Sequence, residues 1–381
     1  MQYFFILGRH PELSKSEILA KFHQLNIEAK EIISTNDFQI FDVDNEIDSA
    51  DFMNQLGGTI KIGKIIAELR NVNVDSLLPL IPESDTKIHF GLSTYGCSLK
   101  IMNIGKGLKM KLKEKELKAR FVSSKENPLS SVIVKKNHLL NKGIEIVVMK
   151  DHEKYIIGQT QEVQPFEQMS KLDYGRPARD DKSGMIPPKL AQIMINLSET
   201  PTNGTILDPF CGSGTIIQQA LLLGYKNVIG SDASEKAILD SKENLAWLAK
   251  KIEKKLKFKL FIAKSTNVTK EVEPNSIDAI ITEPYLGPPL KGGESKDELK
   301  RIMVSLAELY KNTFKTLKYV LKETGTIVII MPIIKTRTQD YKIEMPKVLP
   351  DGLKIEKSWE YSRPGQRVIR KIYKITKEAS K

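Results

Sequence analysis

This sequence has few cysteines and histidines, and their scarcity excludes several kinds of site. The 381 residues include two cysteines, Cys97 and Cys211, and five scattered histidines. Two cysteines cannot form a disulfide framework or a cysteine-rich metal site, and no two histidines have the spacing His-x-x-x-His. We therefore expect no bound metal ion, and a reducing compartment such as the cytoplasm suits the chain.

Long apolar runs are also missing. No stretch of 18 consecutive apolar residues occurs, so the sequence predicts no transmembrane helix and no membrane partner. Residues 1–10 lack a basic leader segment, and we interpret them as the start of a first strand rather than a secretory signal. A composition with 40% hydrophobic and 28% charged residues is typical of globular proteins, and the length suits two or three domains.

Positive charge is abundant but unevenly distributed. The net charge is +12, and Lys and Arg outnumber Asp and Glu by 14 to 4 over residues 87–150. Over residues 10–86 the balance is reversed, at 6 to 14. A basic section beside an acidic one favours a polyanionic partner for the basic section, although a solvated lysine-rich face is the alternative interpretation.

The most informative stretch is Thr205-Ile-Leu-Asp-Pro-Phe-Cys-Gly-Ser-Gly-Thr215. The apolar residues 205–207 predict a buried strand, and residues 215–224 predict a helix that Gly224 ends. Between them, Gly212 and Gly214 permit a sharp turn and close approach of the backbone to a ligand. A strand, a glycine-rich turn and a helix N-terminus together indicate a nucleotide-type site at the carboxyl edge of a parallel sheet.

The charge near this turn limits which ligands it can bind. The turn lacks the Gly-Lys-Ser/Thr of a Walker A loop, and Asp208 at the strand end would repel a pyrophosphate. A carboxylate suits a cationic ligand, such as one carrying an ammonium or a sulfonium group. Asp232 ends the next predicted strand, residues 227–232, where an acid suits ribose hydroxyls; a plain helix cap is the alternative.

Residues 208–215, Asp-Pro-Phe-Cys-Gly-Ser-Gly-Thr, resemble the first motif of class I S-adenosylmethionine methyltransferases, in the form found in enzymes that methylate exocyclic amines of nucleobases. The resemblance implies an α/β, Rossmann-like sheet of seven strands with an antiparallel end hairpin over residues 199–381. It also implies S-adenosylmethionine as cofactor. The cofactor-binding residues that it implies are Asp208, Phe210, Cys211, Gly212, Ser213, Gly214, Thr215, Asp232 and Ala233. Many family members carry an acid after the third strand for the adenine amine; Lys264, Ser265 and Thr266 stand there, so adenine recognition stays open.

Residues 166–198 form a predicted linker that covers the cofactor. Arg176-Pro, then Ser183 and Met185, then Pro188-Lys-Leu-Ala resemble the segment before the first motif in tRNA guanine-N2 methyltransferases. By that resemblance Ser183 and Met185 lie across the cofactor pocket.

Glu283, Pro284 and Tyr285 follow the predicted fourth strand and are the candidate catalytic residues. The family's fourth motif is Asp/Asn/Ser-Pro-Pro-aromatic, whose first side chain accepts a hydrogen bond from the target amine and whose ring stacks on the base. Here Glu replaces Asp, and one proline precedes the aromatic residue. Without a gap, Leu286 takes the aromatic position; with one deletion, Tyr285 does. A capped turn without a catalytic role is the alternative.

The N-terminal part is predicted to hold two α+β subdomains, residues 1–86 and 87–165. In the first we expect strands over residues 3–7 and 38–43, and a helix capped by Ser14, with Glu17 completing a capping box. In the second we expect an amphipathic helix ending near Phe121, and strands over 131–134, 144–149 and 155–160. Its order and position resemble the THUMP RNA-binding module, although a purely structural subdomain is the alternative. The candidate RNA-binding residues are Lys106, Lys109, Lys111, Lys113, Lys115 and Lys118.

Together these features predict an enzyme that uses S-adenosylmethionine to methylate N2 of a guanine in tRNA, at position 10 by resemblance. The expected partner is tRNA or another structured RNA, and the protein is expected to be a monomer or small oligomer without a metal. Two alternatives stay open. One is an amine methyltransferase acting on rRNA or DNA, and the other is an RNA-binding protein with an inactive methyltransferase fold.

Overall fold

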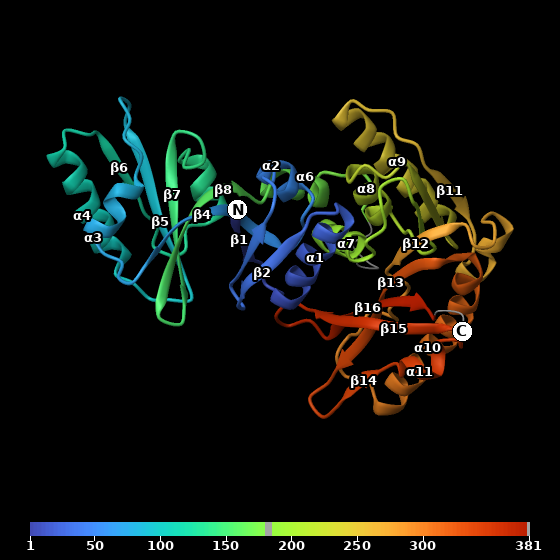
Figure 1. Ribbon diagram of the computed structural model, residues 1–381. Coiled ribbons are helices and arrows are strands. Elements are labelled where there is room, and N and C mark those ends of the chain that lie inside the picture. Colours follow the sequence, from blue (N-terminus) through green and yellow to red (C-terminus); the bar gives the residue numbers. More distant parts are fainter. Residues whose placement is uncertain (180–184, 379–381) are drawn as a thin grey trace. The chain divides into compact units, whose positions relative to one another are not determined.

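The computed structural model describes residues 1–179 and 185–378, and the chain divides into two compact units (Figure 1). The first unit comprises Met1–Ile18 and Leu25–Gln168, and the second comprises Leu19–Gln24 and Met169–Lys381. Ser183, a predicted cofactor contact, lies outside the described residues.

One sheet of eight strands runs through the first unit in the order β2-β3-β1-β4-β8-β7-β5-β6. β4 pairs with β8, so the boundary predicted at residue 86 falls inside one continuous sheet. The strands are β1 (Gln2–Leu7), β2 (Ala29–Ser34), β3 (Phe38–Val43), β4 (Thr59–Leu69), β5 (Ile88–Tyr95), β6 (Ala119–Val122), β7 (Gly143–Asp151) and β8 (Lys154–Val163). The helices of this part are α1 (Pro11–Gln24), α2 (Ser49–Asn54), α3 (Val74–Leu77), η1 (Leu78–Leu80), α4 (Ile101–Glu114) and α5 (Ser131–Lys136).

The capping box predicted at Ser14 and Glu17 is wrong. Helix α1 begins at Pro11, a residue that suits a first helical turn, so Ser14 and Glu17 lie inside the helix and are buried. The Ser14 hydroxyl donates to the carbonyl of Gly58 at 2.8 Å. The two carboxylate oxygens of Glu17 accept from the N–H groups of Gly57 and Gly58, each at 2.8 Å. The two residues therefore hold the turn before β4.

Two further boundaries in this unit differ from prediction. Helix α4 ends at Glu114, and Phe121 belongs to β6, where its ring stacks on Phe90 at 5.3 Å. The strand predicted over residues 131–134 is the helix α5. The hydroxyl of Ser130 accepts from the Ile133 N–H and caps this helix, which overrides the strand preference of its β-branched residues.

A charged pair lies at the centre of the first sheet. Lys61 on β4 and Glu145 on β7 are fully buried, with Nζ and Oε1 2.5 Å apart. Ser93 on β5 and Thr160 on β8 donate their hydroxyls to the same carboxylate, at 2.5 and 2.6 Å. The carboxylate thus joins four strands, and the three donors compensate its removal from water.

The second unit contains the predicted parallel sheet, with the strand order β11-β10-β9-β12-β13-β16-β15. Strands β9 to β13 run parallel and the β15–β16 hairpin runs antiparallel. The prediction of seven strands is wrong by one, because the short β14 pairs with the extended end of β13. The strands are β9 (Thr205–Asp208), β10 (Asn227–Asp232), β11 (Lys259–Ile262), β12 (Ile277–Thr282), β13 (Leu321–Lys335), β14 (Asp340–Lys342), β15 (Leu353–Tyr361) and β16 (Val368–Lys377).

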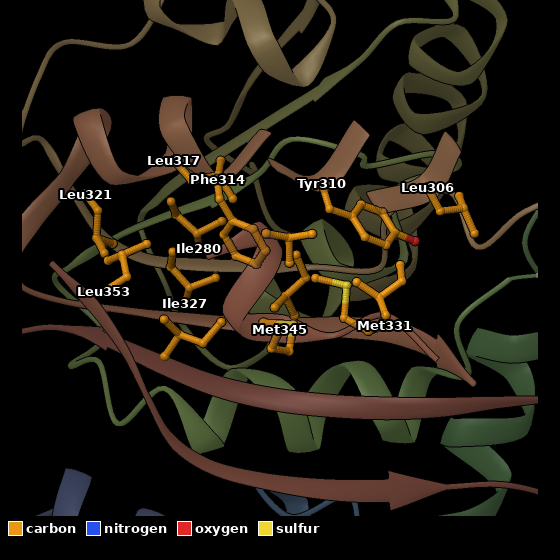
Figure 2. Packing of buried hydrophobic residues seen from close by; sticks show 14 of the residues in the cluster. Ile280, Leu306, Tyr310, Phe314, Leu317, Leu321, Ile327, Met331, Met345 and Leu353 are labelled. Atoms are coloured by element: carbon orange, nitrogen blue, oxygen red, sulfur yellow. The ribbon is translucent and has the colours of Figure 1, made fainter. Parts of the chain in front are cut away.

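Helices pack against this sheet and supply its core. They are α6 (Phe166–Tyr174), α7 (Pro188–Leu197), α8 (Thr215–Leu222), α9 (Glu235–Ile252), η2 (Ser265–Lys270), α10 (Lys296–Val320) and α11 (Met345–Val348). Figure 2 shows Phe314 of α10 directed toward Ile280 of β12 and Ile327 of β13, while Tyr310 of α10 lies toward the Met331 side of the same cluster. Alternate residues of β13 join this cluster, as a strand between two layers requires. Among the helices of the described residues, none has the length and apolar character needed to span a membrane.

Candidate active site

Three carboxylates lie at the carboxyl edge of the second sheet. Asp208 ends β9, Asp232 ends β10, and Glu283 directly follows β12. Because β9 pairs in parallel with both neighbours, all three strand ends meet at this edge. The chain thus brings together the acids that the sequence singled out, and the local charge is negative.

The turn after β9 leaves open space beside these acids. Gly212 has φ of +52° and Gly214 has φ of +84°, values that favour glycine. A Cβ on Gly214 would approach the Ser241 hydroxyl to 2.9 Å, whereas a Cβ on Gly212 would meet no atom within 4 Å. The backbone at Gly212 is therefore accessible to a ligand, while Gly214 packs tightly against α9.

Asp208 is 1% exposed and is held by two donors. Its Oδ1 accepts from the Thr282 hydroxyl at 2.7 Å and from the Phe210 N–H at 3.1 Å. The pKa of this carboxyl is raised to about 7, chiefly by burial and also by the charges of Asp232 and Glu283, while the hydrogen bonds from Thr282 and Phe210 act to lower it. A cation in this site would favour the ionised form.

Asp232 organises the same turn from the neighbouring strand. Its Oδ2 accepts from the Gly212 N–H at 3.0 Å, and its Oδ1 accepts from the Ser234 N–H at 2.9 Å. The side chain is partly exposed, and Ala233 beside it is exposed. A carboxylate has about four acceptor positions, so Asp232 keeps acceptor capacity for a ligand hydroxyl.

The other predicted residues of the first motif are more enclosed. Burial raises the pKa of the Cys211 thiol, so Cys211 behaves as a small apolar residue rather than a nucleophile. The Ser213 hydroxyl lies 3.5 Å from the sulfur of Met185, which places the covering segment against the turn. Thr215 begins α8, and its hydroxyl accepts from Arg176 Nη1 at 2.5 Å.

Asn244 of α9 is a residue that the sequence did not single out. Its Nδ2 donates to the carbonyls of Ser213 and Ala178, both at 2.9 Å, and its Oδ1 accepts from the Ala178 N–H at 3.0 Å. The side chain is fully buried. Asn244 therefore joins the glycine-rich turn to the segment that precedes α7, a long-range contact for which the helix sequence carries no signal.

The end of the third strand offers no acid to an adenine. The Ser265 hydroxyl is buried and lies 2.8 Å from the Thr313 hydroxyl of α10, whereas Lys264 is exposed. Adenine recognition by a carboxylate is therefore absent from residues 264–266.

Glu283 has a partner that the sequence did not indicate. Arg370 of β16 donates from Nε to Oε1 at 2.5 Å and from Nη2 to Oε2 at 3.4 Å. The two side chains are 11% and 12% exposed, so this charge pair is largely shielded from water. The two residues are 87 positions apart in the chain, and the pairing of β13 with both β12 and β16 brings them together.

Pro284 and Tyr285 continue from Glu283. Pro284 is buried, whereas the Tyr285 side chain is 56% exposed, and the next residue, Leu286, is partly buried. The Tyr285 carbonyl accepts from the Tyr310 hydroxyl at 2.6 Å, which fixes the backbone of this loop on α10. The Tyr285 ring is thus largely open to solvent, two residues along the chain from Glu283.

The lysines predicted to bind RNA belong to the first unit. Lys106, Lys109, Lys111 and Lys113 lie on α4, Lys115 caps its end, and Lys118 precedes β6; all six are exposed. Lys111 pairs with Glu114 at 3.2 Å and Lys115 with Glu83 at 3.8 Å. The α4 helix buries Ile101, Leu108 and Leu112 and directs these cations to solvent.

The arrangement around β9 and β10 suits the cofactor that the resemblance implies. The space at Gly212 would admit a ligand against the backbone, and the buried Asp208 with its neighbouring acids suits a cationic one. Within residues 1–179 and 185–378, no group of three or more His, Cys, Asp and Glu side chains is arranged to hold a metal ion.

Comparison with known proteins finds similarity to methyltransferases. A family profile described as "RMKL-like, methyltransferase domain" matches residues 176–342, and one described as "DNA methylase" matches residues 99–243. The tRNA (guanine(10)-N2)-dimethyltransferase of Methanocaldococcus jannaschii is 32% identical over 130 residues, which is 34% of this chain and 36% of that protein. The enzyme of the same name from Methanothermobacter thermautotrophicus is 32% identical over 119 residues, or 31% of this chain and 33% of that protein. The matches thus span about a third of the length of these relatives.

A solved structure extends the likeness of fold. TrmN from Thermus thermophilus superposes with a TM-score of 0.58 at 15% identity, covering 99% of this chain and 100% of that one. At this identity the likeness concerns the fold. The profile match, the motif at the sheet edge and this likeness of fold agree: residues 176–342 are similar to the RMKL-like methyltransferase domain, and part of the chain is similar in sequence to tRNA guanine-N2 methyltransferases.

Proposed function

We propose that this protein uses S-adenosylmethionine to methylate N2 of a guanine in tRNA, at position 10. The observation that carries the proposal is the single edge at which Asp208, Asp232 and Glu283 meet beside the exposed ring of Tyr285. Two sequence relatives, each matched over about a third of its length, are named as tRNA (guanine(10)-N2)-dimethyltransferases, which supports the choice of base and RNA. We place the reaction in the cytoplasm.

The residues at this edge divide into two roles. Asp208 and the turn at Gly212 hold the cofactor, and Asp232 accepts from its ribose hydroxyls. When bound, S-adenosylmethionine supplies an electrophilic methyl group on a sulfonium sulfur. Tyr285 stacks on the extruded guanine, and Glu283 accepts a hydrogen bond from its amine. The exposure of Tyr285 favours the motif register in which this ring stacks on the base.

Glu283 acts mainly by orientation. The nitrogen lone pair is delocalised into the ring, so attack on the methyl group requires that the amine be turned toward it. The new carbon–nitrogen bond forms as the carbon–sulfur bond breaks, and the sulfur keeps the electron pair. The methylated nitrogen is then acidic and releases its proton to Glu283 or water.

The exposed lysines of α4 supply the proposed contact with the tRNA backbone. Cations on one helix neutralise phosphates without reading sequence, which suits a region that holds a folded RNA while another part of the chain acts on a base. We also propose that residues 87–165 form a THUMP-like RNA-binding module. In this proposal the first unit divides into two subdomains at residue 86.

A second candidate substrate is DNA. The DNA methylase profile over residues 99–243 favours it, because the enzymes it describes share the glycine-rich turn. An inactive RNA-binding protein is a third candidate, prompted by the altered fourth motif with its Glu283–Arg370 pair.

One experiment separates these candidates. Isothermal titration measures S-adenosylmethionine binding, and methyl transfer from the labelled cofactor is then measured on bulk tRNA and on duplex DNA, with nucleosides identified by mass spectrometry. The proposal predicts binding and N2-methylguanosine from tRNA. N6-methyl-2′-deoxyadenosine or N4-methyl-2′-deoxycytidine from DNA would support the second candidate, and RNA binding without methyl transfer would support the third.

A further inference from the structure

The pair formed by Glu283 and Arg370 has a donor and acceptor pattern of its own. Glu283 directs two oxygens toward the guanidinium, and Arg370 uses Nε and Nη2 for these contacts. A carboxylate has further lone pairs, a guanidinium carries five N–H donors, and neither contact involves Nη1. The pair therefore presents an acceptor beside a donor at the edge where the target base would be held.

This pattern is complementary to one base. The Watson–Crick edge of guanine offers two adjacent donors, N1–H and an N2–H, next to the acceptor O6. Glu283 would accept from both donors, and Arg370 would donate to O6. Adenine presents an acceptor at N1 and a donor at N6, so each member of the pair would face a group of its own kind.

The position of the pair supports contact with a base. Glu283 follows β12 directly, and Arg370 lies opposite Pro332 in the β13–β16 ladder. The exposed ring of Tyr285, two residues from Glu283, would hold the plane of a base beside them. Both charged side chains retain 11–12% exposure, so they are shielded but can still be reached by a ligand.

We propose that Glu283 and Arg370 together select guanine, with Arg370 as a specificity-determining residue that contacts O6. This inference rests on the proposed function, since it names the feature of guanine that the same site reads. A site built to hydrogen-bond a substrate group rejects an analogue lacking that group, because its own polar groups stay unpaired. Every purine can stack on the Tyr285 ring, so we expect the preference for guanine over other purines to come from these hydrogen bonds rather than from stacking.

The test uses tRNA transcripts carrying guanine, 2-aminopurine or 2,6-diaminopurine at the target position. All three have the 2-amino group, but only guanine has both N1–H and O6. The unmodified enzyme should methylate guanine with a kcat/KM about 100-fold or more above that for either analogue, since two contacts to charged groups are lost. Equal rates on guanine and 2-aminopurine would overturn the inference while leaving the proposed function intact.

Substitutions at Arg370 and at its neighbour Lys371 test which side chain is responsible for the preference for guanine. Arg370→Met should lower kcat/KM for guanine and reduce the preference over 2-aminopurine to about tenfold or less, because the O6 donor is gone. Lys371→Met is the matched control. Lys371 neighbours Arg370 on β16, pairs with Glu360 at 3.4 Å and points to the other face, so the full preference should remain. If Arg370→Met slowed all three substrates by the same factor, Arg370 would be structural and the inference wrong.

A second, more conservative substitution at the same position keeps the inference testable if Arg370→Met does not fold. Arg370→Lys keeps a cation beside Glu283 and one donor, so it should retain an intermediate preference for guanine. If the unmodified enzyme methylates no guanine in any tRNA, the proposed function itself fails. That result is distinguishable from guanine methylation without discrimination.

Discussion

Asp208 is 1% exposed, and removal of its carboxylate from water favours the protonated form. The pKa is raised to about 7 by burial, whereas an unfolded aspartate titrates near 3.9. Between these values the folded state binds more protons than the unfolded state, so stability from this residue is present below about pH 4 and is lost as the pH rises toward 7.

Asp208→Asn should remove this dependence. The amide oxygen can still accept from Thr282 and Phe210, while the buried charge is gone. We expect the free energy of unfolding of the variant, relative to the unmodified protein, to rise by on the order of 2–4 kcal/mol between pH 5 and pH 8. Urea denaturation without cofactor at both pH values measures this, and parallel pH profiles for the two proteins would contradict it.

Asp232 is the residue whose removal should most directly weaken cofactor binding. It holds the Gly212 N–H and is proposed to hold the ribose, so Asp232→Ala loses a charged acceptor worth about 1.5–3 kcal/mol. Isothermal titration should show a Kd for S-adenosylmethionine about 10- to 100-fold higher. Asp240→Ala, on α9 and paired with Lys236 at 2.5 Å, serves as control. An unchanged Kd in a folded Asp232 variant would remove the assigned role.

At this scale the sequence predicted acids better than their partners. Asp208, Asp232 and Glu283 stand directly after recognisable strands, so their positions follow from the strand pattern. Arg370, Asn244 and Thr282 reach the site through contacts between segments far apart in the chain. No local pattern distinguishes such residues from ordinary polar ones.

Among the elements, α4 carries the proposed contact with RNA. Replacing Lys106, Lys109 and Lys113 by Gln should weaken tRNA binding. It should also reduce the magnitude of the slope of log K against log salt by about two to three, because binding releases fewer counterions when phosphate contacts are lost. Binding measured between 50 and 300 mM salt, together with the cofactor Kd, tests this prediction.

The control for charge alone replaces Lys250, Lys254 and Lys255, three exposed residues at the end of α9, by Gln. This variant should lose less tRNA affinity at the same net charge. If both triple variants kept the slope of the unmodified protein, the α4 lysines would be a solvated face.

The buried carboxylate of Glu145 joins β4, β5, β7 and β8 in the first unit. Glu145→Gln leaves Lys61 buried without its counter-ion, which typically costs about 3–5 kcal/mol. Glu114→Gln removes an exposed pair with Lys111 and should cost less than about 0.5 kcal/mol. Chemical denaturation of both variants makes the comparison, and equal losses would show that the network contributes little.

The helix and strand predictions were right where the apolar pattern was strong. They were wrong where a local hydrogen bond, such as a helix cap, favoured a different element. The alternating residues of β3 and the apolar run of β12 predicted strands. Residues 131–134 have the β-branched composition of a strand, yet the Ser130 cap and the burial of Val134 produce a helix. β2 lies at a sheet edge with most residues exposed, so it offered little apolar pattern to detect.

At the scale of the molecule, the sequence predicted the fold class of the second unit and its antiparallel end hairpin, but not the continuous sheet of the first unit. The pairing of β4 with β8 joins segments about 90 residues apart, and neither strand carries a pattern that names its partner. β14 was missed for a similar reason, since three residues acquire strand geometry only by pairing with the long β13. The glycine-rich turn was predictable because one short segment contains the whole motif.

The sheet edge that holds Glu283 and Tyr285 is proposed to methylate a guanine amine in tRNA. The most direct measurement is single-turnover methylation of a tRNA transcript by the unmodified protein and by Glu283→Ala, with the modified nucleoside and its position identified by mass spectrometry. We predict N2-methylguanosine at position 10 and a rate about a hundredfold or more lower for the variant, with cofactor binding preserved. An equal rate in the variant, or a methyl group on another base, would contradict the account.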